Sequence, residues 1–160
     1  MNYPTLPFTP NRPRQPFDPY LAVFIIALFL LLWFAVAMVW GSEIMPPNIL
    51  YKGLIAEAVS EGEIGMTAIC FVYKNRLEKG MPLGCVALKR KDLDKFVERQ
   101  GRRYELMAKS IIQKVFYGDV PDISKGATHY ENEMAFGKPY WAKNMVVVAR
   151  IGSHIFYKEK

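Results

Sequence analysis

Three glutamates, Glu57, Glu61 and Glu63, stand within seven residues and are the first candidates for chemistry. A carboxyl cluster is typical of general acid catalysis, in which a protonated acid gives its proton to a leaving group. Two of the three have structural explanations. Ser60 and Glu63 match the capping box of a helix start, and Glu61 falls in the first turn of that helix, where the dipole favours negative charge. Glu57 has neither explanation.

Glu57 is expected near the C-terminal end of a helix over residues 49–59 that is capped by Asn48. The helix dipole disfavours a carboxylate there by roughly 0.3–1 kcal/mol. At about 100° per residue, Glu57 lies about 20° from Leu50 and about 60° from Leu54, on the apolar side of the helix. Partial burial and the dipole both raise a carboxyl pKa, and a carboxylic acid kept protonated can protonate a glycosidic oxygen. A helix-end glutamate paired with a nearby lysine is the structural alternative.

A second candidate segment, residues 126–132, is polar and aromatic and is followed by Tyr140 and Trp141. Aromatic faces stack on pyranose rings, and Asn, Thr and His side chains bind hydroxyl groups, a mixture that is usual in a carbohydrate cleft. The alternative is that the aromatic residues only pin a loop to the core.

The remaining pattern predicts the elements that position these residues. Helical spacing of apolar residues, with turn and cap signals, predicts further helices from Ser60 to about Leu77, over 92–99, and over 103–117 with Gly118 closing the last in the left-handed conformation. Residues 146–151 and 154–157, joined by Gly152-Ser153, predict a β-hairpin with a Gly-first turn. The predicted fold class is α+β, a mostly helical domain with a small C-terminal β-hairpin.

A long apolar run precedes this domain. Leu21 to Trp40 contains only Leu, Ala, Val, Phe, Ile, Met and Trp, and as a helix it would rise about 30 Å, the thickness of a hydrocarbon core. We therefore expect one transmembrane helix over residues 20–41, in contact with the lipid bilayer. A cleavable signal peptide is the competing interpretation, but the run is longer than a usual signal core and no small-x-small pattern follows it.

Arg12 and Arg14 precede this helix, so the positive-inside rule places the N-terminus in the cytoplasm and the domain in the periplasm or outside the cell. The protein would be a single-pass membrane protein. The predicted divisions are a Pro-rich flexible tail (1–19), the transmembrane helix (20–41), a tether (42–52) and a folded domain (53–160) that carries the candidate residues.

Charge and cysteine content narrow the possible partners. The net charge of +6 suits an anionic partner, but the densest basic run, Lys89 to Lys91, is typical of a solvated face rather than of a nucleic-acid site. Two cysteines and two histidines, without CxxC or HExxH spacing, predict no metal and no cofactor. Cys70 and Cys85 are expected to be separate buried thiols, with one disulfide between them as the alternative.

Several stretches resemble a known enzyme family. EAVSEGEIGMTAICFVYKNR resembles the opening motif of the SleB/CwlJ-type cell-wall hydrolases, in which E-A-x-x-E is followed by a Gly and, after an apolar helix, by an Asn-Arg pair. Those positions are Glu57, Ala58, Glu61, Gly65, Asn75 and Arg76. GATHYEN, PYWA and VARIGSHIFY resemble the C-terminal half of the same family, in versions met in bacteriophage lysis proteins. The resemblance spans about residues 54–157.

This resemblance implies a lysozyme-like lytic transglycosylase that acts on peptidoglycan glycan strands, with Glu57 as the catalytic acid. In such enzymes one glutamate protonates the bond between N-acetylmuramic acid and N-acetylglucosamine, and its carboxylate then accepts the proton of the muramic 6-hydroxyl as a 1,6-anhydro ring closes. No second carboxylate nucleophile is needed, unlike two-carboxylate hydrolysis. The residues expected to bind the glycan are Glu61, Asn75, His129, Tyr130, Glu131, Tyr140 and Trp141.

The chain departs from the family pattern at two places. Lys95-Phe96 stands where many relatives carry a Gln-Phe pair, so a substrate contact by that Gln is not carried over. Glu131 replaces the second His of the GATHYH form, and it is a second acid, a hydrogen-bond acceptor at the groove edge, or neither. His129 and Tyr130 are expected either to contact sugar or to orient Glu57.

Two functions are compatible with these features. The first is a membrane-anchored, bacteriophage-type enzyme that cuts peptidoglycan in phage lysis, phage penetration or wall remodelling. The alternative is a non-catalytic, membrane-anchored virion or envelope protein that binds peptidoglycan. An intact acid on the apolar side of a helix favours the enzyme.

Overall fold

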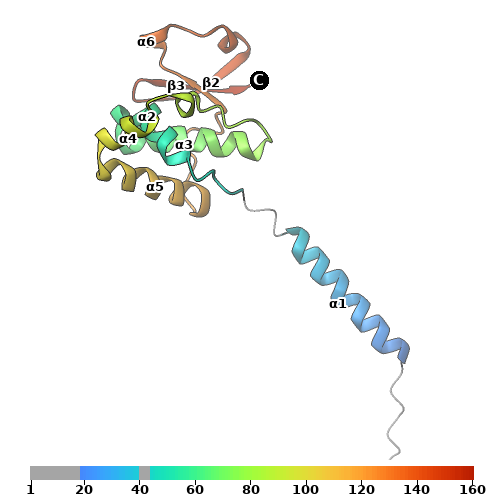
Figure 1. Ribbon diagram of the computed structural model, residues 1–160. Coiled ribbons are helices and arrows are strands. Elements are labelled where there is room, and N and C mark those ends of the chain that lie inside the picture. The colour runs from blue at the N-terminus through green and yellow to red at the C-terminus, as the bar shows by residue number, and fades with distance from the viewer. Residues whose placement is uncertain (1–18, 40–43) are drawn as a thin grey trace, which may run out of the picture. The chain divides into compact units, whose positions relative to one another are not determined.

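The computed structural model describes residues 19–39 and 44–160, which fall into two units. The first unit contains helix α1 (Pro19–Val39) (Figure 1). Among the described residues, no helix combines the length and the apolar character needed to cross a bilayer. The anchor stays a prediction from the sequence. The predicted tail lies outside the described residues except for its last position, and so do the first two positions of the tether.

The second unit, Ile44–Lys160, holds every other described element (Figure 1). Its α-helices are α2 (Leu50–Ala58), α3 (Gly62–Glu78), α4 (Leu93–Gln100), α5 (Arg102–Tyr117) and α6 (Glu133–Phe136). Its strands are β1 (His129–Glu131), β2 (Met145–Ile151) and β3 (His154–Glu159). Short 3-10 helices are η1 (Val59–Glu61), η2 (Val86–Lys89) and η3 (Tyr140–Asn144). The predicted mostly helical α+β domain is confirmed.

Helix α3 is the centre of the core. Residues 65–73 are buried apart from Thr67, so this helix is covered on almost all sides. Helices α2 and α5 pack against it, and α4 packs against α2 and α5. Leu54 and Ile55 of α2 are fully buried in the same cluster. Because α2 is held over its whole length, the end that carries Glu57 has a defined position.

The sheet lies against the helices (Figure 1). Its strand order is β1-β3-β2, with all pairs antiparallel. The predicted hairpin of β2 and β3 is confirmed. Gly152 has φ +58° at the first turn position, which favours glycine because a Cβ is strained there. Strand β1 was not predicted, since residues 126–132 were expected as a loop. Three residues are too few to show a strand period, and β1 exists because Tyr130 pairs with Phe156 across the sheet.

The predicted capping box does not form. Helix α3 begins at Gly62, with Glu61 at its N-cap position and no side-chain cap hydrogen bond. Ser60 lies in η1, where the chain turns between α2 and α3. Gly62 has φ +67°, so the turn is made by this glycine and the helix starts later than the Ser60–Glu63 spacing suggests.

Two other predicted helix ends are also wrong. Ile49, rather than Asn48, occupies the N-cap position of α2, and no side chain caps that helix. Gly118 follows α5 with an extended backbone, φ −96° and ψ 169°, instead of the left-handed conformation. In both places the tertiary path of the chain overrides a local preference.

Candidate active site

Glu57 lies in the last turn of α2 and lines a cleft of about 500 Å³. Its Oε1 accepts a hydrogen bond of 2.9 Å from the backbone N–H of Ala87 in η2. The Cys85 thiol lies 3.9 Å from the same oxygen. Gly53 leaves room for this thiol, because a Cβ added there would lie 2.6 Å from Sγ. The segment around η2 therefore holds one carboxylate oxygen in place at the wall of the cleft.

Two tyrosines stand beside the Glu57 carboxylate. The hydroxyls of Tyr73 on α3 and Tyr130 on β1 are 3.0 Å apart, and Tyr130 also interacts with the Glu57 side chain. Burial, and then the negative charge of Glu57, raise the pKa of Tyr130. Burial likewise raises the pKa of Tyr73 well above its usual value. Both hydroxyls stay protonated at neutral pH, so each can act as a hydrogen-bond donor near the carboxylate.

His129 and Trp141 form another part of the wall, with ring centroids 5.2 Å apart. His129 Nδ1 lies 2.9 Å from Thr128 Oγ1, and its Nε2 lies 3.5 Å from Arg76 Nη1. Burial and the Arg76 charge lower the pKa of His129. The ring is therefore neutral near pH 7 and suits hydrogen bonding to sugar hydroxyls better than proton donation.

Glu61 is placed outside the lining of the cleft, although it was expected to bind glycan. Its carboxylate accepts hydrogen bonds from the Ser153 N–H (2.9 Å) and hydroxyl (2.5 Å), and His154 Nδ1 lies 3.7 Å away. Gly65 and Gly152 approach it so closely that an added Cβ would lie 2.2 Å and 2.0 Å from Glu61 atoms. Glu61 thus fastens the β2–β3 turn to the start of α3.

Asn75 and Tyr140 also lie outside the cleft lining. Asn75 Nδ2 contacts Asp122 Oδ2 and the Ala127 carbonyl oxygen, each at 3.0 Å, and so ties the segment before β1 to α3. Tyr140 begins η3 and is 82% exposed, with Lys143 Nζ 4.6 Å from its ring centroid. The cleft brings together the other five predicted site residues: Glu57, His129, Tyr130, Glu131 and Trp141.

The cleft also contains groups that were not predicted to be in the site. Tyr73 looked like an ordinary core residue on an apolar helix, and the Ala87 N–H has no signal in the sequence. Arg76 does have one, since it belongs to the Asn-Arg pair of the opening motif. Val86 and Phe136 line the cleft as exposed apolar side chains.

Among the described residues, no group of three or more His, Cys, Asp or Glu side chains is placed to hold a metal ion. Cys70 and Cys85 are both buried and free. Burial raises the pKa of Cys70 to about 12 and also raises the pKa of Cys85. Both are thiols at neutral pH.

The structure defines a class of protein: a small α+β domain in which a glutamate at a helix end lines a polar and aromatic cleft. A family model described as Cell Wall Hydrolase matches residues 60–157, which is more than half of the chain. The protein belongs to this cell wall hydrolase family, as the resemblance predicted, and its family substrate is the peptidoglycan wall. Comparison with curated proteins and with solved structures gave no match. The matched region contains Tyr73, Arg76 and β1, and Glu57 lies just before its first residue.

Proposed function

We propose that the protein cleaves the glycosidic bond between N-acetylmuramic acid and N-acetylglucosamine in peptidoglycan, with Glu57 as the catalytic acid. The observation that carries this proposal is the position of the Glu57 carboxylate. It lies in the cleft, where one of its oxygens accepts a hydrogen bond from the Ala87 N–H and the Tyr130 side chain lies beside it. Family membership supports the wall polymer as substrate. Such a cut would open the wall locally, in phage lysis, phage penetration or remodelling.

The proposed route uses Glu57 twice. Protonated Glu57 gives its proton to the glycosidic oxygen as the bond from the muramic C1 to that oxygen breaks. The muramic 6-hydroxyl oxygen then bonds to C1, and the Glu57 carboxylate takes up its proton, so the acid is regenerated and no water is consumed. The Ala87 N–H, hydrogen-bonded to Glu57, and the nearby Tyr130 hydroxyl would stabilise the carboxylate between the two steps. Tyr73 would hold Tyr130 in that position.

Hydrolysis is a second route, favoured by one observation. Glu131 also lines the cleft and is a second carboxylate that could activate a water molecule, as in two-carboxylate glycosidases. The products separate the routes, because transglycosylation leaves 1,6-anhydro muropeptides and hydrolysis leaves reducing ends.

The test compares purified peptidoglycan sacculi treated with the wild-type chain and with Glu57→Gln. The substitution keeps the side-chain shape but removes the transferable proton, so we expect turbidity clearing to stop and wild-type digests to contain 1,6-anhydro products by mass spectrometry. Glu63→Gln is the matched control, since Glu63 is exposed and forms a surface ion pair with Lys114 at 3.4 Å. Full clearing by Glu57→Gln would refute the role of the acid. Release of free stem peptides would mean an amidase, and binding without clearing by the wild type would mean a non-catalytic protein.

The proposal includes the cellular position of the enzyme. The apolar run from Leu21 to Trp40 supports a bilayer anchor, and Arg12 and Arg14 before it support a cytoplasmic N-terminus. The catalytic domain would then work on the wall close to the membrane.

A further inference from the structure

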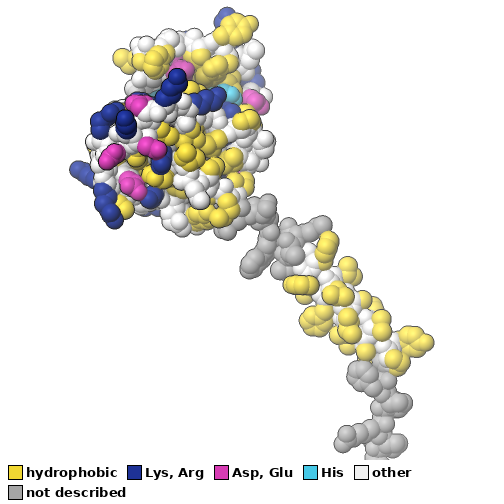
Figure 2. Space-filling model, viewed as in Figure 1, with side chains coloured by type: hydrophobic (Ala, Val, Ile, Leu, Met, Phe, Trp, Pro, Cys, Tyr) yellow, Lys and Arg dark blue, Asp and Glu magenta, His cyan; other side chains and the backbone are white. Residues whose placement is uncertain are grey.

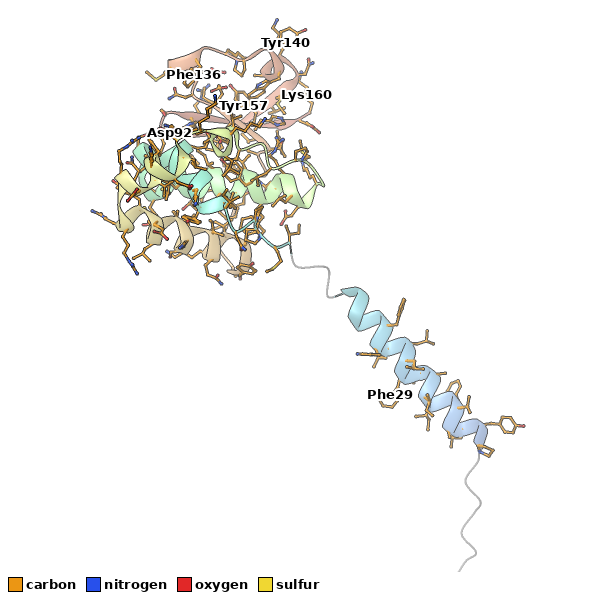
Figure 3. The ribbon with its side chains drawn as sticks, in the orientation of Figure 1. Phe29, Asp92, Phe136, Tyr140, Tyr157 and Lys160 are labelled. Carbon is orange, nitrogen blue, oxygen red and sulfur yellow. The ribbon has the colours of Figure 1, made fainter. Side chains whose placement is uncertain are left out.

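The segment between β1 and β2, residues 132–141, forms an arm that exposes large apolar side chains. Met134 and Phe136 on α6 are 94% and 81% exposed, and Tyr140 is 82% exposed. Figure 2 shows apolar side chains gathered at this end of the domain, and Figure 3 shows Phe136 and Tyr140 projecting from the arm. Single exposed apolar residues are ordinary, but three within seven residues indicate a binding surface.

The base of the arm is fixed although its outer side chains are exposed. Asn132 Nδ2 donates to Ser153 Oγ at 3.0 Å, and the Tyr157 hydroxyl donates to the Glu133 carboxylate. At the other end, the rings of Trp141 and Tyr157 meet edge to face at 5.3 Å. The arm is therefore fastened at both ends, to β3 and to the β2–β3 turn, so its backbone path is fixed.

Phe136 differs from its neighbours on the arm because it lines the cleft that contains Glu57. Met134 is on the same short helix but is not among the lining residues. One ring face of Tyr140 lies near Lys143 Nζ. Among the described residues, by contrast, no aromatic ring or cation stacks on Phe136. An exposed ring at the rim of a glycan cleft is thus free to receive a ligand.

We propose that Phe136 forms an outer sugar-binding subsite, on which one pyranose of the glycan strand stacks while the bond to be cut lies at Glu57. The inference rests on the proposed function and extends it to how a long strand is held. The C–H groups on one face of a pyranose form a flat apolar surface, and it gains dispersion contacts on an aromatic ring. Val86, 70% exposed, also lines the cleft and adds apolar surface to it.

The test measures binding separately from cleavage. The full chain carrying Glu57→Gln is mixed with purified sacculi, and its dissociation constant is determined by co-sedimentation. Adding Phe136→Ala should weaken binding by about twofold to tenfold, the range for one aromatic contact. Phe136→Trp should restore binding because it keeps a flat ring, whereas Phe136→Leu should not. In the chain with intact Glu57, Phe136→Ala should raise KM for glycan strands and leave kcat unchanged.

Met134→Ala is the matched control, since it removes a more exposed apolar side chain from the same helix. Unchanged sacculus binding by this variant supports the proposal. Equal weakening by Met134→Ala and Phe136→Ala, or full binding by Phe136→Leu, would overturn it in favour of a general apolar surface. Sacculus binding that stays intact in Phe136→Ala would also overturn it, because the ring would then hold no sugar. If the wild-type chain proves not to cut peptidoglycan, this binding comparison remains interpretable, because it needs no cleavage.

Discussion

Removing the Glu61 carboxylate should detach the β2–β3 turn from the helices. The side chain is only 11% exposed and accepts two hydrogen bonds from Ser153. A hydrogen bond to a charged group contributes roughly 1.5–3 kcal/mol. Glu61→Ala loses both bonds and leaves the Ser153 N–H without its acceptor, so the free energy of unfolding should fall by about 3–5 kcal/mol. Glu61→Gln keeps the size and one acceptor oxygen, and should lose about 1–2 kcal/mol.

Thermal unfolding followed by circular dichroism measures this effect. For a domain of this size, 1 kcal/mol corresponds to roughly 4 °C, so Glu61→Ala should lower Tm by about 12–20 °C. Glu63→Ala is the control. Its carboxylate is 59% exposed and forms a surface ion pair with Lys114, so the change should stay within about 0.5 kcal/mol.

Acid unfolding gives a second measure of the same contact. Burial raises the pKa of Glu61, but the Ser153 hydrogen bonds and nearby His154 outweigh it, and the pKa lies below its ordinary value of 4.5. A depressed pKa in the folded state stabilises the protein fully above about pH 4.5, and that contribution is lost as the pH falls through the folded pKa. Stability should therefore fall less steeply below pH 4.5 in Glu61→Gln than in the wild type.

The opposite pattern would refute this reasoning. If Glu61→Ala unfolds at the wild-type temperature but loses sacculus binding or clearing, Glu61 contacts the glycan, as the family resemblance implied. If Glu61→Ala, Glu61→Gln and Glu63→Ala all keep the wild-type Tm, the Ser153 contacts contribute nothing measurable to stability.

Two further predictions concern the acid and the anchor. Tyr130→Phe removes the hydroxyl beside Glu57, so kcat on sacculi should fall on the order of 10- to 100-fold. Because Tyr73 loses its hydrogen-bond partner, the free energy of unfolding should also fall by about 1 kcal/mol. An unchanged kcat would mean that the hydroxyl has no part in orienting the acid. After an alkaline carbonate wash, the full chain should stay in the membrane pellet and a chain of residues 42–160 should not, because only the full chain carries the apolar run. Full-length protein in the supernatant would reject the anchor.

Most of the helices and the β-hairpin could be predicted from the sequence, because apolar spacing and turn residues are local signals. The same local reasoning selected Glu57, a carboxylate on the apolar side of a helix end, and the motif resemblance indicated the family. Local signals were weaker at the ends of elements. The Ser60–Glu63 spacing matched a capping box, but Gly62 turns the chain there and α3 starts later.

The contacts that build the site come from residues far apart in the chain, and only the tertiary structure decided them. The Ala87 N–H bonds Glu57 from thirty residues away, and a backbone donor leaves no mark in the sequence. Tyr73 lies on the apolar face of its helix, so the sequence indicated an ordinary core residue. The pairing of its hydroxyl with that of Tyr130 is visible only in the structure. Glu61 stood close to Glu57 in the motif, yet its hydrogen-bond partner Ser153 lies 92 residues further along the chain. Residue types and the local spacing of apolar residues determined which helices and strands form and which carboxylate is the candidate acid. Long-range packing decided which groups face that acid, because such juxtapositions depend on the path of the whole chain.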